Sequence, residues 1–142
     1  MKLQVADLNS FYGPAHILFD IALNVGEGEG VALLGRNGAG KSTTFRSIVG
    51  LVESRSGRIV FEGRDVTSEP THAIVRGGLG YVPEERRIFT DLTVDENLEV
   101  GRQPKRPNAP YWTREKLFTL FPKLGEMRNR PGGRMSGGEQ QM

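Results

Sequence analysis

Residues 35–43 have the types and spacing of a loop that binds phosphate groups, because they match the pattern G-x-x-x-x-G-K-[ST] in full. Glycines allow backbone N–H groups to turn inward around an anion, and a following helix adds its free N-terminal donors and the positive end of its dipole. Lys41 would place a charge at the β and γ phosphates, and the Ser42 hydroxyl would ligate Mg²⁺. The predicted contacts to the nucleotide are Gly35, Asn37, Gly38, Ala39, Gly40, Lys41, Ser42 and Thr43. The alternative is a glycine-rich turn without a ligand.

A buried strand before this loop and a helix after it would support nucleotide binding. Residues 31–34, Val-Ala-Leu-Leu, form a short apolar run between two glycines, which is typical of a central parallel strand covered on both faces. After the loop, apolar residues recur at helical spacing at Phe45, Ile48, Val49 and Val52. Gly50 or the Ser-Gly pair at 56–57 would end this helix. The sequence thus predicts a strand, the phosphate loop and a helix in series.

The composition fits one domain and excludes several classes of protein. The 142 residues suffice for a hydrophobic core. A net charge of +2, from 19 basic and 17 acidic residues, is too balanced to argue for nucleic acid as a partner. The absence of cysteine excludes disulfides and thiol ligands. Neither a signal-peptide core nor an apolar run long enough to span a bilayer is found, so we expect a cytosolic protein that reaches a membrane through a partner.

Alternating apolar residues predict antiparallel strands around the phosphate loop. A first strand is indicated over residues 3–8 and ends at a turn over 9–14. A second strand is predicted from apolar residues at every second position, Ile17, Phe19, Ile21, Leu23 and Val25. Residues 58–62 form a third, closed by a hairpin at Gly63 and Asp65. A further buried strand over 79–82 would join 31–34, so that antiparallel strands bracket a parallel core.

Helical signals dominate the second half of the chain. Residues 70–76 indicate a short helix, and Thr93 with Glu96 forms a capping box whose helix runs to about Gly101. Thr113 can cap another helix, which Pro122 breaks. Its predicted core-facing residues are Leu117, Phe118, Leu120 and Phe121, extended by Leu124 and Met127.

Two further stretches complete this half. The basic, proline-rich connection 101–110 is a solvated loop or, alternatively, a contact to lipid headgroups. After a loop over 128–134, residues 136–139 supply a second capping box, and the chain ends at Met142 within the helix that this box opens.

Together, three features resemble the nucleotide-binding subunit of ATP-binding cassette (ABC) transporters. They are the phosphate loop, residues 135–141 (Met-Ser-Gly-Gly-Glu-Gln-Gln), which are similar to the family signature L-S-G-G-Q, and a helical insert of the right size between them. The resemblance covers all 142 residues but about three-fifths of a family domain. Residues 81–89 and 92–98 look most like the smaller ATPase of branched-chain amino acid importers. Closely similar subunits serve urea uptake, and lipopolysaccharide exporters are somewhat further off.

The resemblance implies an α/β P-loop NTPase fold with a parallel core sheet, an antiparallel β subdomain and a helical subdomain, truncated at the signature. Residues 1–30 and 57–68 would form the antiparallel layer, and 31–56 with 79–83 the core. Residues 84–135 would contain a Q-loop-type segment and the helical subdomain, and 136–142 the start of the signature helix.

The resemblance also implies roles for residues outside the phosphate loop. Tyr12 would stack on adenine, unless it merely packs at a turn. Glu84 stands where the family has a glutamine that reaches Mg²⁺ and the attacking water, and a carboxylate can ligate the metal but cannot donate an N–H. The signature residues that would bind the γ-phosphate of ATP held by a second subunit are Ser136, Gly137, Gly138 and Glu139. Taken alone, these four residues are just a capping box.

In function, the resemblance predicts a transport ATPase on the cytoplasmic face of the cell membrane, with ATP and Mg²⁺ as cofactors. Its partners would be a second ATPase subunit in a head-to-tail dimer, transmembrane permease subunits that residues 86–92 would face, and an extracytoplasmic solute-binding protein. The solute would be branched-chain amino acids. The alternatives are a urea importer, a lipopolysaccharide exporter, a soluble cassette protein acting on ribosomes or in DNA repair, and a non-catalytic ATP-binding fragment.

The 142 residues alone are expected to bind Mg-ATP weakly without turning it over. The family's second acidic motif, its catalytic glutamate and its switch histidine lie downstream of the signature, and His16 and His72 lie before it. No carboxylate assigned within the chain would take a proton from water.

Overall fold

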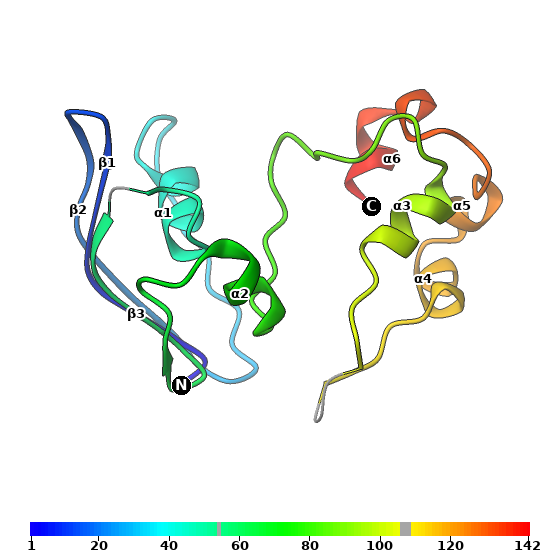
Figure 1. Ribbon diagram of the computed structural model, residues 1–142. Helices are drawn as coiled ribbons and strands as arrows, with labels where there is room; N and C mark the ends of the chain where they lie inside the picture. The colour runs from blue at the N-terminus through cyan, green and yellow to red at the C-terminus, as the bar shows by residue number, and fades with distance from the viewer. Residues whose placement is uncertain (54, 106–108) are drawn as a thin grey trace. The chain divides into compact units, whose positions relative to one another are not determined.

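The computed structural model describes residues 1–53, 55–105 and 109–142, which divide into two compact units (Figure 1). Unit 1 comprises Met1–Tyr81 and unit 2 comprises Val82–Met142. Within the described ranges, unit 1 contains the sheet and two helices, and unit 2 is helical. Within these ranges no helix has the length and apolar character needed to cross a membrane.

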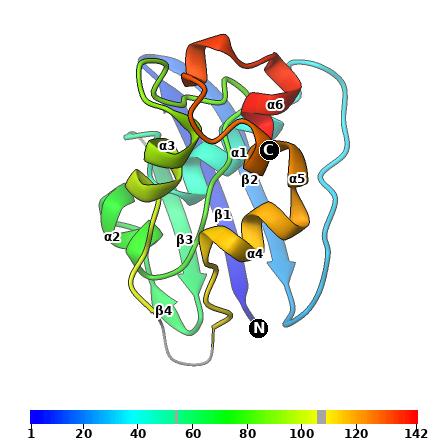
Figure 2. The same ribbon diagram turned by 90° about the vertical axis from the view of Figure 1, so that its right-hand side faces the viewer.

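Unit 1 is built on an antiparallel sheet with the strand order β2-β1-β3-β4 (Figure 2). The strands are β1 Leu3–Tyr12, β2 Ala15–Val25, β3 Arg55–Phe61 and β4 Arg64–Asp65. Both hairpins turn through two residues, with Gly13 and Gly63 at φ angles of 56° and 78° that favour glycine. The predicted antiparallel layer and the hairpin at Gly63 are confirmed.

Three register shifts between β1 and β2 change the side-chain alternation that the sequence predicts, and two of them coincide with a residue of positive φ. One lies in β1 at Asp7, whose φ is 50°, and the other in β2 at Asp20, whose φ is 47°. An inserted residue reverses the alternation between the residues before it and those after it, so that the two sets do not keep one face. As a result Leu18 is buried, with 2% of its surface exposed, whereas Phe19 is 63% exposed. The prediction that Phe19 lies on the inner face is therefore wrong. The predicted turn over 9–14 is also shorter, because β1 continues to Tyr12.

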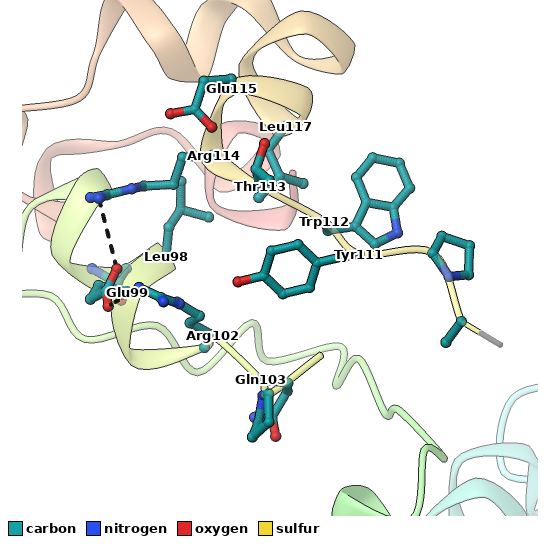
Figure 3. A pocket seen from close by; sticks show the side chains of 15 residues that line it. Leu98, Glu99, Arg102, Gln103, Tyr111, Trp112, Thr113, Arg114, Glu115 and Leu117 are labelled. Atoms are coloured by element: carbon teal, nitrogen blue, oxygen red, sulfur yellow. Dashed lines mark hydrogen bonds and ion pairs between the residues drawn. The ribbon is translucent and has the colours of Figure 1, made fainter. Parts of the chain in front are cut away.

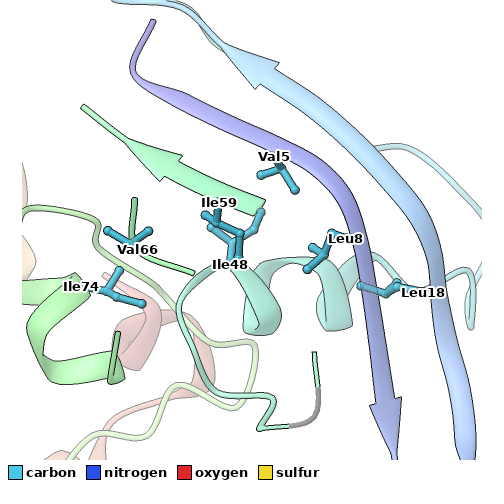
Figure 4. Packing of buried hydrophobic residues seen from close by; sticks show 7 residues of the cluster. All are labelled: Val5, Leu8, Leu18, Ile48, Ile59, Val66 and Ile74. Carbon is cyan, nitrogen blue, oxygen red and sulfur yellow. The ribbon is translucent and has the colours of Figure 1, made fainter. Parts of the chain in front are cut away.

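Helix α1, Lys41–Ile48, packs on β1 and β2, and α2, Thr71–Arg76, adds Ile74 to the same core (Figure 4). The buried apolar side chains of this core are Val5, Leu8, Leu18, Ile48, Ile59, Val66 and Ile74. A buried hydrogen bond of 2.7 Å between the hydroxyls of Ser10 and Ser47 ties β1 to α1. Both predicted helices are confirmed. However, Phe45, which the sequence predicts on the apolar face of α1, is exposed.

The two stretches predicted as strands of a parallel core, 31–34 and 79–82, are not strands in the described structure. A strand is stabilised by hydrogen bonds to a neighbouring strand, and neither stretch joins the sheet of unit 1. Leu34 is accordingly 87% exposed, and Val82 is also exposed. The predicted burial of 31–34 is therefore wrong in the described structure, because an apolar pattern within one segment does not supply its pairing partner. In the described residues the fold is α/β with an antiparallel sheet.

Unit 2 consists of short helices: α3 Val94–Val100, α4 Arg114–Leu120, α5 Pro122–Glu126, the 3-10 helix η1 Gly132–Arg134 and α6 Gly137–Gln141. The three predicted N-caps are confirmed. Thr93, Thr113 and Ser136 each accept a hydrogen bond from the backbone N–H three residues further on. The boxes at Thr93 and Ser136 are complete, because the glutamate also bonds back to the cap N–H.

A small apolar cluster holds these helices together. Its buried members are Val94, Leu124 and Met127, with Leu98, Phe118, Phe121 and Met135 packed against them. Leu120, predicted in this core, is exposed instead. Asp95 adds ion pairs to Arg114 at 2.8 Å and to Arg128 at 3.3 Å, which link α3 to α4 and to the chain after α5. In the predicted solvated connection, residues 101–105 are exposed, and residues 106–108 lie outside the described part.

Candidate phosphate-binding site

The loop 35–40 winds into the N-terminus of α1 through two glycines in left-handed conformations. Gly38 and Gly40 have φ angles of 84° and 87°, which side chains rarely adopt. Gly40 is the N-cap of α1, and its carbonyl accepts hydrogen bonds from the N–H and the hydroxyl of Thr44 at 2.8 and 3.0 Å. The first N–H groups of α1 have no intrahelical acceptors and therefore stay available to an anion.

Gly40 also fixes the loop against the core of unit 1. A Cβ atom at this position would lie 2.7 Å from Cδ2 of Leu18, a distance at which something must shift. Leu18 is fully buried beneath it in β2. The φ angle therefore favours glycine at this position, and a larger residue would also have to displace the buried end of Leu18. Sequence analysis missed the contact with Leu18, because the bulge at Asp20 decides which β2 side chain faces inward.

Lys41, the first residue of α1, points back over the loop. Its ammonium group donates to the carbonyl of Gly35 at 2.7 Å and to that of Arg36 at 2.8 Å. This geometry places a positive charge inside the curve of the loop. The Ser42 side chain is exposed, and within the described residues its hydroxyl has no hydrogen-bond partner. Unit 1 thus brings a cation, a free hydroxyl and helix N–H groups to one place.

Tyr12 ends β1 in the same unit. Leu8 and Ser10 of β1 are buried, and Ser10 bonds to Ser47 of α1, so this face of the strand is the one that α1 covers. Because side chains alternate along a strand, Tyr12 lies on that face as well. Its side chain is 46% exposed, so the ring is accessible to a flat ligand.

The remaining predicted site residues belong to unit 2. Glu84 is exposed in the segment that follows Pro83. Ser136 caps α6, whose first two residues are Gly137 and Gly138. The N–H of Ser136 donates to the Glu139 carboxylate at 2.8 Å, and this bond, together with one from the Ser136 hydroxyl, lowers the pKa of Glu139. Site residues therefore form two groups, one in each unit.

Unit 2 also contains a hollow of about 490 Å³ that includes none of the predicted site residues (Figure 3). Tyr111 and Trp112 line one side of it, and Arg102 and Gln103 line another. Arg102 is paired with Glu99 at 3.0 Å, and Arg114 is paired with Asp95. Because both arginines at the hollow are already paired, it is a poor site for a phosphate despite its size. In the described residues no group of three or more histidine, cysteine or acidic side chains could hold a metal ion.

Asn97, in the second turn of α3, was also missed by sequence analysis. Its side chain bonds to the main chain of the segment that precedes α3, between Phe89 and Thr93. An asparagine four residues after a capping threonine is the available signal, since positions four apart share one helix face.

Comparison with known proteins shows which family the chain belongs to. Residues 18–142 match the family model described as ABC transporter. The high-affinity branched-chain amino acid transport ATP-binding protein BraG of Pseudomonas aeruginosa is 40% identical over 95% of this chain and 58% of its own length. The lipopolysaccharide export system ATP-binding protein LptB of Haemophilus influenzae is 39% identical over 97% of this chain and 58% of its own. A solved ATP-binding subunit of an ABC transporter matches 99% of the chain and 58% of its own, with a TM-score of 0.80 and 31% identity.

The fold is therefore that of the P-loop NTPases of ABC transporters. The chain belongs to the ABC transporter family, as an ATP-binding domain. It spans somewhat less than three-fifths of the length of these relatives.

Proposed function

We propose that this chain belongs to the ATP-hydrolysing subunit of a transporter that imports branched-chain amino acids. The observation that carries the proposal is the position of Lys41, whose ammonium lies within the curve of a glycine loop at the start of α1. A charge held there by two carbonyls is ready to exchange them for phosphate oxygens, which accept charge-assisted hydrogen bonds more strongly. The branched-chain assignment rests on the similarity to BraG over nearly the whole chain.

The residues of unit 1 fit a nucleoside triphosphate with Mg²⁺. Lys41 and the helix N–H groups would bind the β and γ phosphates, and the Ser42 hydroxyl would ligate the metal ion. Gly35, Asn37, Gly38, Ala39, Gly40 and Thr43 would line the phosphates. The exposed ring of Tyr12 would stack on adenine. Bound Mg²⁺ neutralises charge that develops during phosphoryl transfer.

Unit 2 would act on the nucleotide of a second subunit in a head-to-tail dimer. Ser136 and the two glycines that follow would present a hydroxyl and N–H groups to the γ-phosphate. Glu139 would remain bonded to Ser136 as a cap, which fixes the serine backbone.

Glu84 would reach Mg²⁺ as a ligand. Residues 86–92 would contact the permease subunits, and an extracytoplasmic solute-binding protein would deliver the solute to those subunits. The ATPase subunit would therefore lie at the cytoplasmic face of the membrane.

A transport assay tests this function. The gene that contains this chain is expressed in a strain that lacks the ATPase subunits of branched-chain amino acid uptake, together with its own permease genes, and uptake of labelled leucine is measured. We expect uptake that the Lys41→Ala variant loses. Uptake unaffected by Lys41→Ala contradicts the proposal.

Lipopolysaccharide export is the second candidate, because LptB is 39% identical to the chain, nearly the same value as BraG. The same gene is introduced into a strain depleted of LptB. Rescue of growth there, without leucine uptake, would favour export over import.

A further inference from the structure

The Asn97 side chain is bonded on both of its ends to the segment that precedes α3. Its Oδ1 accepts from the N–H of Phe89 at 2.9 Å. Its Nδ2 lies within hydrogen-bond distance of three carbonyls, those of Phe89 at 3.0 Å, Leu92 at 3.2 Å and Thr93 at 2.9 Å. A carboxamide has two donors and two acceptor sites, so the donors of Asn97 are fully used within this segment. One side chain thus ties together the main chain at Phe89, Leu92 and Thr93.

The other side of the same segment is bonded to the turn that precedes the signature. Gly132 N–H donates to the Leu92 carbonyl, and Gly133 N–H donates to the Thr90 carbonyl, both at 2.8 Å. A Cβ atom on Gly132 would lie 2.9 Å from the carbonyl oxygen of Phe89. The two backbones therefore approach too closely for a larger residue at Gly132.

From this turn, contacts continue into α6. The Gln140 amide donates to the carbonyl of Gly132 at 3.0 Å. A Cβ atom on Gly137 would lie 2.9 Å from Nη2 of Arg86, so the guanidinium rests against the first residue of the helix. The backbone N–H of Gln140 donates in turn to the carbonyl of Ser136 at 2.9 Å. An unbroken series of hydrogen bonds and close contacts thus leads from Asn97 through the segment and the turn to Ser136.

We infer that Asn97 is a positioning residue that, with the Gly132–Gly133 turn, makes residues 89–93 and the N-terminus of α6 move as one body. The inference rests on the proposed function, in which residues 86–92 contact the permease and Ser136 contacts ATP of the second subunit. A displacement of residues 86–92 by the permease would then be passed to Ser136. In this role Asn97 acts through the main chain of residues 89–93, to which its side chain is bonded.

Hydrogen exchange of the backbone amides, measured on the purified chain, tests whether Asn97 holds residues 89–93 and the Gly132–Gly133 turn together. Asn97→Ala is expected to speed exchange of the Phe89, Gly132 and Gly133 amides by about tenfold or more, as for the loss of a well-made hydrogen bond. The Val94 and Asp95 amides, which bond to Arg130 and Arg128 carbonyls, should keep their rates. Asn129→Ala is the matched control, because Asn129 is exposed in the same unit. Unchanged Gly132 and Gly133 amides, or a uniform increase across unit 2, would overturn the inference.

A disulfide provides a second, independent variant. The chain has no cysteine, and a Cβ atom on Gly133 would lie 3.3 Å from Cβ of Thr90, close to the span of a disulfide. Thr90→Cys with Gly133→Cys should therefore join the segment to the turn when oxidised. In the Asn97→Ala background, oxidation should restore slow exchange at Gly132, and reduction should abolish it. If oxidation does not restore slow exchange at Gly132, the contact between residues 89–93 and the Gly132–Gly133 turn does not have the inferred role.

The functional arm uses the complete transporter in membrane vesicles. Asn97→Ala is expected to lower solute-stimulated ATP turnover by about tenfold, a typical coupling between sites, while ATP affinity stays within about twofold. The oxidised cysteine pair should recover the stimulation. ATP binding that does not depend on Lys41 would refute the proposed function itself. Lys41-dependent binding, with full stimulation in Asn97→Ala, would refute the inference alone.

Discussion

The two units hold their functional loops in different ways. Seven buried apolar side chains form the core under the phosphate loop in unit 1, whereas unit 2 has three such residues in its described part. In unit 2, polar contacts supply much of the remaining order, since Asp95 joins two arginines and Asn97 holds the preceding segment. Hydrogen bonds and ion pairs are individually weaker than core burial but are directional. The comparison indicates a rigid base for one site and an adjustable support for the other.

The largest effect is expected in the core of unit 1. Ile59 of β3 is fully buried, so Ile59→Ala should cost about 2–5 kcal/mol of unfolding free energy through lost burial and a cavity. Val60→Ala is the control, because Val60 is the adjacent, half-buried residue of the same strand. Urea unfolding followed by far-UV circular dichroism measures both. Equal losses would mean that the core is not concentrated on the face of the sheet that α1 covers.

Lys41 gives the next largest effect, on ligand binding rather than on folding. Lys41→Ala should weaken binding of a fluorescent ATP analogue by about 1.5–3 kcal/mol, because a charge-assisted contact to phosphate is lost. Lys116→Ala removes an exposed lysine of unit 2 and should leave the titration unchanged. The same affinity in Lys41→Ala and in the unchanged chain would remove the basis for a phosphate site in this loop.

Tyr12 gives a third test within the same unit. Tyr12→Ala should weaken the ATP analogue by about 1–3 kcal/mol, whereas Tyr12→Phe should largely retain binding, because stacking needs the ring and not the hydroxyl. Calorimetric titration of the three proteins decides between these roles. A loss with phenylalanine as large as that with alanine would show that the hydroxyl is what matters.

The sequence predicted local features well and long-range ones poorly. The phosphate-loop pattern, the N-caps at Thr93, Thr113 and Ser136 and the hairpin at Gly63 each depend on a few adjacent residues, so spacing suffices to find them. The inward position of Leu18 depends on the bulge at Asp20, which the alternation of apolar residues does not reveal.

Residues 31–34 illustrate a second kind of limit. Their apolar run indicates burial, but a strand needs a neighbour to pair with, and that neighbour is not encoded in the run itself. The contacts of Asn97 are a third case, since they depend on where the chain before α3 and the turn at Gly132 meet in space. The resemblance to the family came from two short local motifs and from the size of the helical insert between them.

Smaller effects are expected at the two capping boxes of unit 2. Thr93→Ala and Ser136→Ala should each cost about 0.5–2 kcal/mol of stability, since each removes the acceptor of a helix N–H. Substitution of either residue by glycine should cost only a few tenths. Thermal unfolding of unit 2, followed by the fluorescence of Trp112, the sole tryptophan of the chain, measures the change. Alanine variants as stable as the parent would show that these caps contribute nothing.

The smallest expected effects are the responses of the capping boxes at Thr93 and Ser136 to pH and to salt. The pKa values of Glu96 and Glu139 both lie below the usual 4.5, first because of the cap N–H and then because of the cap hydroxyl. A folded-state pKa below the unfolded one stabilises the fold above about pH 4.5, and this stabilisation is lost as the pH falls through the folded-state pKa. The amide proton shifts of Thr93 and Ser136 should follow that loss, and Glu96→Gln, which still caps but does not titrate, should abolish it at Thr93.

Salt then distinguishes the causes of the two shifts. The pKa of Glu139 is lowered further by the charges of Lys123 and Arg130, whereas the lowering of the Glu96 pKa is due to Thr93 alone. Mobile ions screen charges at a distance but leave hydrogen bonds of about 3 Å nearly intact. Raising the NaCl concentration from about 0.05 to 1 M should therefore raise the pKa of Glu139 and leave that of Glu96 almost unchanged. Equal shifts in the two NMR titrations would mean that both boxes sense the same field. The conclusion that surrounding charges lower the pKa of Glu139 but not that of Glu96 would then be wrong.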